Sequence, residues 1–385
     1  MATKIMYLLD YYEHPHGGTE GQVLQLIQHL DRSRYEPSLA VLRSSAYIEQ
    51  NPFPCPVRVL GIGGIGTPWA IAKLLRFAYA LRRRGYRIVH CFFNDVSLIA
   101  PPLLKTFGIR VLVSRRDLGF WYTPRILAAL RAASWFVDRY VANSRAVSRV
   151  VQEKERVAEG RISVIYNGFT PASKVGASTG DAEALRTLSG NRIIGIVANL
   201  RPIKRVDTLI RAFGAIHADF PDVRLAIVGD HESEQAAGVR EELVNLAGGA
   251  GVRDKIIFTG GVADAAPYIE RFTVAVLCSE SEGFSNALIE YMHAGRPVVC
   301  TDAGGNTELV TDEVDGLVVP VGDAGALADR LARLLSDRDL ARRLGEAARE
   351  TIRLNYTHTR MTAEQMACYD AVLSASRLAE APKRA

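Results

Sequence analysis

The sequence contains few cysteines, and they lack the spacing by which cysteines bind metal or form a disulfide framework. Its 385 residues include 5 cysteines, with no C-x-x-C pair and no neighbouring cluster of histidines. This pattern excludes a disulfide scaffold and a zinc ribbon, and it is typical of a protein from a reducing compartment.

Long apolar runs and two nucleotide-binding motifs are also missing. No uncharged apolar run reaches the roughly 18–20 residues that span a membrane, and the opening MATKIMYLLD predicts a strand rather than a secretory signal. The chain has no G-x-x-x-x-G-K-S/T motif, and the glycines after the first expected strand do not form G-x-G-x-x-G. These absences argue against a P-loop ATPase and a Rossmann dehydrogenase.

Charge is unevenly distributed along the chain, although the net charge of +5 is modest. Residues 1–168 carry 23 basic and 12 acidic side chains, a net charge of +11, whereas the remaining residues carry −6. This asymmetry indicates either an anionic partner for the first half or an uneven scatter of solvated arginines.

The length and the hydropathy pattern predict two α/β domains. A chain of 385 residues exceeds a single core, and short apolar runs alternate with amphipathic stretches, which is typical of parallel sheets with crossover helices. Strands are expected in two series, at 5–9, 38–42, 57–60, 88–91, 111–114, 139–142 and 162–166, and at 192–197, 224–228, 256–259, 274–278, 297–300 and 316–320. Expected helices include 20–30, 68–84, 124–136, 207–219, 234–248, 285–294 and most of 324–378.

A stretch rich in Gly, Ser, Thr and Ala at 170–190 separates the two series and is interpreted as a linker that leads into a short helix. Ligands of open α/β sheets bind beyond the carboxyl ends of the strands. The loops that follow strands are therefore where functional residues are expected.

Two such loops in the first half hold glycine, histidine and polar residues. Gly17 and Gly18 precede a helix, where backbone N–H groups can bind a phosphate, although the same pair also suits a plain tight turn. His90 ends a strand ahead of Asn94 and Asp95. It is either an acid or base in a cleft, or a buried histidine bonded to the backbone.

A third loop combines arginine with aromatic residues. Arg115 and Arg116 end a strand, and three aromatic residues follow at 120–122. Guanidinium groups suit phosphate, and aromatic rings suit a sugar face or a membrane interface. The alternative is a solvated loop with its tryptophan packed underneath.

The second half places several cations in one loop. Asn199, Arg201, Lys204 and Arg205 follow the first strand of that half and open a helix, which indicates a diphosphate clamp. Gly229 follows the next strand.

Two glutamates lie eight positions apart after the strand at 274–278. Glu282 lies in a loop beside Gly283, and Glu290 lies about one and a half turns into a helix that Ser285 or Asn286 opens. Carboxylates at these two positions can each accept hydrogen bonds from the vicinal hydroxyls of a sugar or a ribose.

Seven segments occur in order along the chain: GGTE near the start, VIYNGF at 164–169, LRPIKR at 200–205, IVGD at 227–230, EGFSNALIEYMHAGRPVV at 282–299, a Gly pair with Glu308, and DGLVVP at 315–320. This set resembles the retaining GT-B glycosyltransferases known as group 1 or family 4. The resemblance covers essentially the whole chain.

The resemblance implies an α/β fold of the GT-B type, with two Rossmann-like doubly wound domains facing across a cleft. Residues 1–168 with the C-terminal helix 359–385 would bind the acceptor, and residues 169–358 would bind the nucleotide-sugar. It further implies no cofactor and no metal, because cations and helix N-termini neutralise the donor diphosphate.

Carried over by position, the resemblance assigns Lys204 to the diphosphate, Glu282 to the donor sugar and Glu290 to the ribose. The predicted catalytic residues are His90, Lys204 and Glu282. The predicted substrate-binding residues are Gly17, Gly18, Asn94, Arg115, Arg116, Asn199, Arg201, Arg205, Gly229, Gly283, Phe284, Ser285, Asn286 and Glu290.

The sequence departs from the pattern of the family at three positions. Asn199 replaces an arginine of the clamp, Arg205 replaces a glycine after the lysine, and Phe92 replaces the second histidine of an H-x-H pattern. Arg201 or Arg205 then has to supply the missing charge of the clamp.

The implied reaction is metal-independent transfer, with retention, of a sugar from a nucleotide-sugar to a polysaccharide or lipid-linked acceptor in cell-envelope glycan biosynthesis, with a UDP-sugar favoured over GDP-mannose. The alternatives on the same fold are an epimerase or phosphorylase of sugars and a non-catalytic partner subunit. No motif for a pyridoxal lysine is present, and the intact Lys204, Glu282 and Glu290 argue against a non-catalytic role.

The expected location is the cytoplasm, with peripheral binding to the inner face of the membrane. The candidate membrane patch combines residues 82–84, Arg115, Arg116, the aromatic residues 120–122 and Arg125. Nucleic acid is not an expected partner, because no recognised nucleic-acid-binding motif is present.

Overall fold

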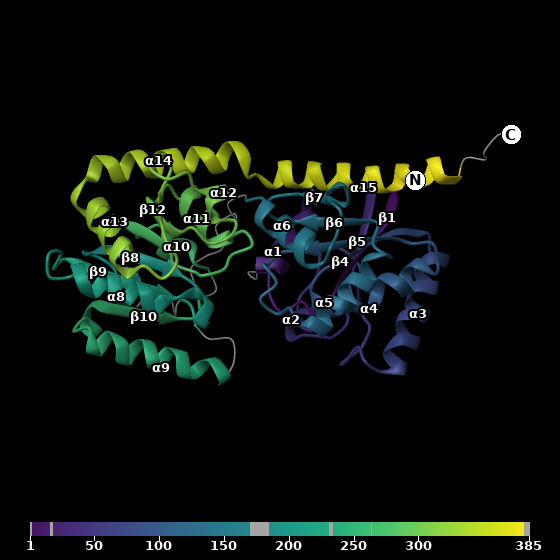
Figure 1. Cartoon of the computed structure of the whole chain (residues 1–385), viewed down its shortest axis with the longest axis horizontal. Helices are drawn as coiled ribbons and strands as arrows, with labels where there is room; N and C mark the ends of the chain where they lie inside the picture. Colours follow the sequence, from purple (N-terminus) through teal and green to yellow (C-terminus); the bar gives the residue numbers. More distant parts are fainter. Residues whose placement is uncertain (1, 16–17, 170–184, 231–233, 263, 381–385) are drawn as a thin grey trace. The chain divides into compact units, whose positions relative to one another are not determined.

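The computed structural model describes residues 2–15, 18–169, 185–230, 234–262 and 264–380 (Figure 1). The chain divides into two compact units, one of residues 1–168 with 358–385 and the other of residues 169–357. The first boundary coincides with the predicted one, and the return to unit 1 comes one residue before the predicted start of the last helix. Most of the expected linker, 170–184, lies outside the described residues.

Unit 1 contains a seven-stranded sheet in the order β3-β2-β1-β4-β5-β6-β7, with every neighbouring pair parallel. Its strands are β1 (Thr3–Leu9), β2 (Tyr35–Val41), β3 (Val57–Val59), β4 (Tyr86–Cys91), β5 (Arg110–Arg115), β6 (Arg139–Ala142) and β7 (Ile162–Val164). Its helices are α1 (Gly18–His29), α2 (Ala46–Gln50), α3 (Pro68–Arg83), α4 (Asn94–Lys105), α5 (Pro124–Ser134), α6 (Arg145–Lys154) and α15 (His358–Glu380).

Both faces of this sheet are covered, because alternate residues of β1 enter two different apolar clusters. Ile5 and Tyr7 pack with α1 and α15 on one face, whereas Met6 and Leu8 pack with α3, α4 and α6 on the other. A parallel strand buried on both faces reads as a continuous apolar run, which is why β1 was recognisable in the sequence.

Unit 2 contains a six-stranded parallel sheet in the order β10-β9-β8-β11-β12-β13. Its strands are β8 (Arg192–Val197), β9 (Val223–Val228), β10 (Ile256–Gly260), β11 (Val274–Leu277), β12 (Val298–Thr301) and β13 (Leu317–Val319). Its helices are α8 (Val206–Ile216), α9 (Glu234–Gly249), α10 (Ala266–Ile269), α11 (Asn286–His293), α12 (Asn306–Leu309), α13 (Ala324–Ser336) and α14 (Arg338–Asn355). This order is that of a doubly wound Rossmann-like sheet.

Several helices begin where local sequence signals predict. α3 and α5 each start at a proline that follows a threonine, and the threonine hydroxyl accepts a hydrogen bond from the first turn. Ser285 caps α11 in the same way. Proline at the first helical position lacks the N–H that would otherwise stay unpaired, so both signals favour a helix start.

A chain of buried hydroxyls fixes α15 to the sheet of unit 1. Tyr369 on α15 lies 3.1 Å from the hydroxyl of Tyr7 and 2.9 Å from Nδ1 of His90. The second ring nitrogen of His90 lies 2.9 Å from Oγ of Ser114. All four side chains are buried, so this polar chain holds the last helix in register across the sheet.

The position of His90 corrects the prediction that it is catalytic. Its side chain is 0% exposed, and both ring nitrogens are occupied by protein partners. Burial, and secondarily the charge of Arg116, lowers the pKa of His90 to about 3. The ring is therefore neutral and inaccessible, as in the alternative of a buried core histidine.

Arg115 also differs from its predicted role in substrate binding. Its guanidinium is buried and makes two hydrogen bonds to Glu155, with Nε 2.6 Å from Oε1 and the terminal nitrogen 2.9 Å from Oε2. Tyr122 donates its hydroxyl to the same carboxylate. A guanidinium committed to a buried partner holds β5 against the end of α6 and is not offered to a ligand.

We expect Tyr369→Phe to lower the free energy of unfolding of unit 1 by about 1–3 kcal/mol, because it leaves buried polar atoms of Tyr7 and His90 without a partner. All 3 tryptophans lie in unit 1, so their fluorescence during denaturant unfolding reports this unit. The control is Tyr79→Phe, whose ring is 54% exposed and whose loss of a hydroxyl should cost under about 0.5 kcal/mol. Equal effects of the two variants would contradict the account.

Arg115→Met should destabilise unit 1 by about 3–5 kcal/mol, because the Glu155 carboxylate is left buried and unpaired. The double variant Arg115→Met/Glu155→Gln removes that charge and should recover most of the loss in the same unfolding measurement. If Arg115 bound substrate instead, the single variant would be close to wild type in stability and would be altered only in substrate affinity.

Candidate functional site

The loop after β8 carries Lys204 to the carboxyl edge of the unit 2 sheet. It contains a 3-10 turn, Pro202–Lys204, and ends at Arg205, whose φ of 49° and ψ of 40° lie in the left-handed region. The side chain of Arg205 turns to Asp207, with Nε 3.1 Å from Oδ1, and lies 3.5 Å from Glu280. The two neighbouring cations thus have different partners.

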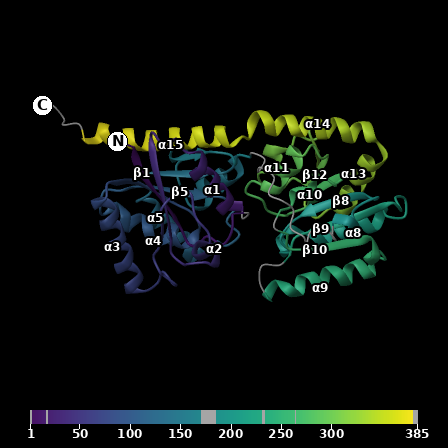
Figure 2. The ribbon, with the colours of Figure 1, turned by 180° about the vertical axis from the view of Figure 1, so that it is seen from behind.

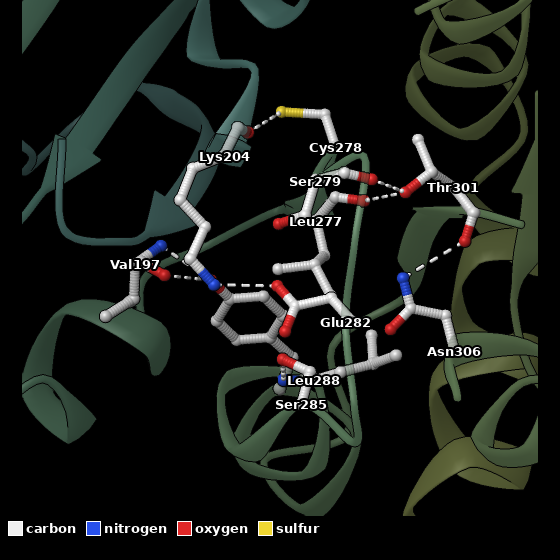
Figure 3. Close-up of polar contacts among 11 residues, drawn as sticks. Val197, Lys204, Leu277, Cys278, Ser279, Glu282, Ser285, Leu288, Thr301 and Asn306 are labelled. Carbon is white, nitrogen blue, oxygen red and sulfur yellow. Dashed lines mark hydrogen bonds and ion pairs between the residues drawn. The ribbon is translucent and has the colours of Figure 1, made fainter. Parts of the chain in front are cut away.

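Lys204 forms an ion pair with Glu282, the first of the two spaced glutamates. The ammonium Nζ lies 2.7 Å from Oε1 of Glu282, and the two side chains point toward one another (Figure 3). The Lys204 side chain is 23% exposed and that of Glu282 is 10% exposed. The cation predicted for the diphosphate and the carboxylate predicted for the sugar are therefore in contact.

Contacts from the loop that follows β11 hold the lysine loop in place. Glu280 donates its backbone N–H to the carbonyl of Ile203 at 3.0 Å. The Cys278 thiol lies 3.2 Å from the carbonyl oxygen of Lys204 (Figure 3). It lies equally far, 3.2 Å, from the carbonyl oxygen of Arg205. Burial raises the pKa of this thiol to about 12, so it stays protonated and can donate. These contacts stabilise the left-handed turn that precedes α8.

The loop of Glu282 is anchored from its other side by β12. The Thr301 hydroxyl donates to the carbonyl of Ser279 at 2.6 Å. The Asn306 side-chain amide donates to the carbonyl of Thr301 at 3.1 Å (Figure 3). Gly305 donates its backbone N–H to the carbonyl of Glu282 at 3.0 Å. Both loops that meet at the ion pair are thus fixed by their backbones.

Glu290 lies on α11, the helix that Ser285 caps by accepting from Leu288 N–H at 3.3 Å. It is half-buried, and no hydrogen bond to its carboxylate occurs within the described ranges. Burial, with a smaller contribution from the charge of Asp264, raises the pKa of Glu290 to about 7. Such a carboxylate gains hydrogen-bond donors when a polar ligand binds beside it.

The other predicted residues of unit 2 surround this region but differ in accessibility. Gly283 is buried, Phe284 is 5% exposed with its ring 5.5 Å from that of Tyr356, and Asn286 is half-buried at the first position of α11. Asn199 is half-buried and Arg201 is exposed. Arg201 and Arg205 line one cavity with residues of α8 and α9.

Gly229 is explained by backbone packing. Its φ is 127°, and a Cβ atom built there would lie 2.2 Å from the carbonyl oxygen of Ala198. Only glycine allows the loop after β9 to approach the loop after β8 this closely. The close approach of the two loops explains why glycine occupies this position, and the predicted role of Gly229 in substrate binding stays a prediction.

The carboxyl edge of the unit 1 sheet is organised by Asp10, which sequence reasoning did not single out. Its buried carboxylate accepts the N–H groups of Asn94, Asp95 and Val96 at 3.1, 2.9 and 2.8 Å. It therefore caps α4 from a position 84 residues away in the sequence. Arg43 lies 2.8 Å from Asp95 and so completes a charged cluster.

The remaining predicted residues of unit 1 lie at the same edge. The half-buried Arg116 donates to the Asn167 side chain at 2.6 Å, and burial lowers its pKa to about 10. Gly18 is the exposed first residue of α1. Gly17 lies outside the described residues.

Five residues that hold the loops at these two edges were not singled out by the sequence: Asp10, Arg43, Cys278, Thr301 and Asn306. Asp10 was detectable in principle, because it directly follows the first buried strand. Cys278 and Thr301 act through contacts with distant backbone carbonyls, for which the sequence carries no signal. Within the described ranges no group of three or more His, Cys, Asp or Glu side chains is placed to hold a metal ion.

Comparison with protein families assigns both halves of the chain. Residues 16–173 match the model described as Glycosyltransferase Family 4, and residues 181–351 match the model described as Glycosyl transferases group 1. A lipopolysaccharide core biosynthesis mannosyltransferase of Rhizobium leguminosarum bv. viciae is 29% identical over 84% of this chain and 92% of its own length.

Another similar protein is the N-acetyl-alpha-D-glucosaminyl L-malate synthase of Bacillus anthracis, which is 29% identical over 47% of this chain. The chain spans about half the length of this relative, 46%, and of the putative glycosyltransferase EpsD of Bacillus subtilis, 54%.

Solved structures share the fold over nearly the whole chain. Anabaena HepE in complex with UDP superimposes with a TM-score of 0.82 at 20% identity, covering 96% of this chain and 100% of the other. The sucrose-phosphate synthase of Thermosynechococcus elongatus does so with a TM-score of 0.80 at 21% identity, covering 97% and 100%. With both family models matched in order, this chain belongs to the group 1 and family 4 glycosyltransferases of the GT-B fold.

Proposed function

We propose that this chain transfers a sugar from a nucleotide-sugar to a lipid-linked or polysaccharide acceptor of the cell envelope, with retention of configuration and without a metal ion. The observation that carries the proposal is the Lys204–Glu282 ion pair at the carboxyl edge of the unit 2 sheet, followed by Glu290 on α11. Unit 2 would bind the donor and unit 1 the acceptor.

Each partner of the ion pair has one part of the donor to bind: Lys204 binds the diphosphate, and Glu282 binds the sugar. A diphosphate bound at the Lys204 ammonium competes with Glu282 for its hydrogen bonds, because phosphate oxygens carry more charge than one carboxylate. Glu282 then accepts hydrogen bonds from the hydroxyls of the sugar attached to that diphosphate. The Lys204 side chain is the more exposed of the two, which suits the approach of an anion.

Glu290 is positioned for the ribose. It lies eight residues after Glu282 and in the second turn of α11, whose first turn presents backbone N–H groups near the loop of Glu282. A carboxylate accepts hydrogen bonds from two vicinal hydroxyls. The raised pKa of Glu290 reflects a buried site in which few protein groups donate hydrogen bonds to the carboxylate.

The reaction requires charge stabilisation at the departing phosphate more than it requires a nucleophilic side chain. Negative charge develops on the nucleoside diphosphate as the sugar acquires oxocarbenium character, and Lys204, Arg201 and the N-terminus of α11 are the groups of unit 2 that favour that charge. Retention follows if the acceptor hydroxyl attacks from the face of the leaving phosphate, which takes its proton. His90 is excluded from this step by its burial.

A UDP-sugar is the proposed donor. Support comes from the fold relative HepE, whose structures contain UDP and UDP-glucose. A related mannosyltransferase of Mycobacterium tuberculosis, 28% identical over 72% of this chain, is GDP-mannose-dependent, so both bases belong in a test.

A cell-envelope acceptor is supported by the biosynthetic roles in the names of the relatives, which include lipopolysaccharide core and phosphatidylinositol monomannoside. Such acceptors are anchored in lipid, which favours a protein that works in the cytoplasm at the inner face of the membrane. None of the helices in the described part of the chain combines the length and apolarity of a transmembrane span.

A panel of UDP- and GDP-sugars should show one UDP-sugar that the wild type hydrolyses slowly without acceptor and uses faster with one, unaffected by EDTA. Lys204→Met should lower kcat by about 100-fold or more, because it removes a cation at the leaving group. The matched control, Lys255→Met, changes a lysine of unit 2 that lies beyond the clamp loop, just before β10, and should match the wild type. Turnover of no donor, or equal turnover by the two variants, would contradict the proposal.

The donor affinity should depend on pH through Glu290. The pKa of about 7 is raised above the usual range, so the carboxylate is protonated below that pH and loses a hydrogen-bond acceptor for the ribose. We expect kcat/KM for the UDP-sugar to decrease as the pH falls below about 7, with a slope that approaches a tenfold loss per pH unit. The Glu290→Gln variant should have a lower kcat/KM that no longer falls below about pH 7. The control Glu346→Gln, which changes an exposed glutamate, should show the same pH dependence as the wild type. A wild-type profile that is flat between about pH 6 and 8 would remove the ribose role of Glu290.

A further inference from the structure

One segment of unit 1 is free of acidic residues over an unusual length. Residues 50–94 contain no Asp or Glu and seven Lys or Arg. The segment includes α3, which lies beside α4 in the helical layer of unit 1 (Figures 1 and 2). Five of these seven cations lie on α3 or at its C-cap: Lys73, Arg76, Arg82, Arg83 and Arg84.

The outer face of α3 combines these cations with exposed aromatic rings. Trp69, Ala72, Arg76, Tyr79 and Arg83 are all exposed and follow one another at three- and four-residue intervals, which places them on one face of a helix. Trp69 is 55% and Tyr79 is 54% exposed. Large aromatic rings left in solvent along a basic face indicate a partner surface.

The opposite face of α3 accounts for its packing, so the outer face is not needed for the fold. Leu74, Phe77, Ala78 and Leu81 are buried in the apolar cluster of unit 1. The first ring of the outer face is held in place, because Nζ of Lys73 lies 3.6 Å from the Trp69 ring centroid while it donates to backbone carbonyls of the preceding loop.

We propose that this outer face of α3, defined by Trp69, Ala72, Arg76, Tyr79 and Arg83 with the adjacent Arg82 and Arg84, docks on a lipid bilayer that contains anionic headgroups. Charge complementarity favours this partner, since arginines attract the headgroups and Trp and Tyr rings settle at the level of the glycerol backbone. A second copy of the chain is disfavoured, because a two-fold contact on this face would set arginines against arginines.

This surface shares residues 82–84 with the membrane patch expected from the sequence, but it does not include Arg115 or Arg116. Arg115 is buried against Glu155 and Arg116 is bonded to Asn167, so neither belongs to an exposed patch. The proposed function places the enzyme at a membrane, and the outer face of α3 is the surface that we propose makes this contact. The docking proposal therefore rests on the proposed function. Its test, however, measures lipid binding and needs no turnover.

The test is co-sedimentation with vesicles of phosphatidylcholine, with and without phosphatidylglycerol. The wild type should bind only the anionic vesicles and should be released by high salt. The triple variant Arg76→Gln/Arg82→Gln/Arg83→Gln should bind about 100-fold more weakly, at about fivefold per arginine. Trp69→Ala leaves the charge of the protein unchanged and should also weaken binding to the anionic vesicles, because it removes an aromatic ring from the docking face.

The matched control removes three exposed arginines from unit 2, Arg338→Gln/Arg342→Gln/Arg353→Gln on α14, and should bind anionic vesicles like the wild type. Thermal unfolding and UDP-sugar binding, measured on the same samples, separate a loss of docking from a loss of folding or of donor binding. The proposal is overturned if the wild type ignores anionic vesicles at low salt, if both triple variants lose binding equally, or if the face binds RNA or a second copy but no lipid.

Discussion

All strand pairings in the two sheets are parallel, and this constraint decides where the chemistry of the chain can lie. Parallel strands bring every loop that follows a strand to one edge, so residues far apart in sequence meet there. In unit 2 the loop after β8 meets the loop after β11, and Lys204 reaches Glu282 across 78 positions. Contacts from Cys278 and Thr301 to backbone carbonyls then hold both loops, so the ion pair is presented by fixed main chain.

Periodicity predicted the strands well, because strands buried on both faces are continuous apolar runs. It missed α4, which contains Pro101 and Pro102 and follows Phe93 at a φ of 70°. That helix is capped by Asp10, and no local sequence signal reveals a cap from a different strand end. In unit 2 the structure brings Lys204 and Glu282 into contact, and both residues occur within short motifs of the sequence. Their roles toward a substrate, and that of Glu290, stay predictions.

The predictions that were wrong concern polar residues at strand ends in unit 1. His90 and Arg115 end β4 and β5, and position alone suggests an open site for both. Each instead has a buried partner from a distant segment, Tyr369 on α15 for His90 and Glu155 after α6 for Arg115. Whether a polar side chain at a strand end faces solvent depends on which helix covers that end, and this is a property of the tertiary fold. Four arginines of unit 1, Arg76 and Arg82 to Arg84, lie instead on or beside the outer face of α3, in a segment of the sequence without Asp or Glu.

The central claim is that the Lys204–Glu282 pair is the donor site of a glycosyltransferase. The most direct measurement is a crystal structure of the chain with a bound UDP-sugar. We expect the diphosphate at the Lys204 ammonium, the sugar hydroxyls on Glu282 and the ribose hydroxyls on Glu290. A nucleotide bound elsewhere, with the Lys204–Glu282 contact unchanged at 2.7 Å, would contradict it.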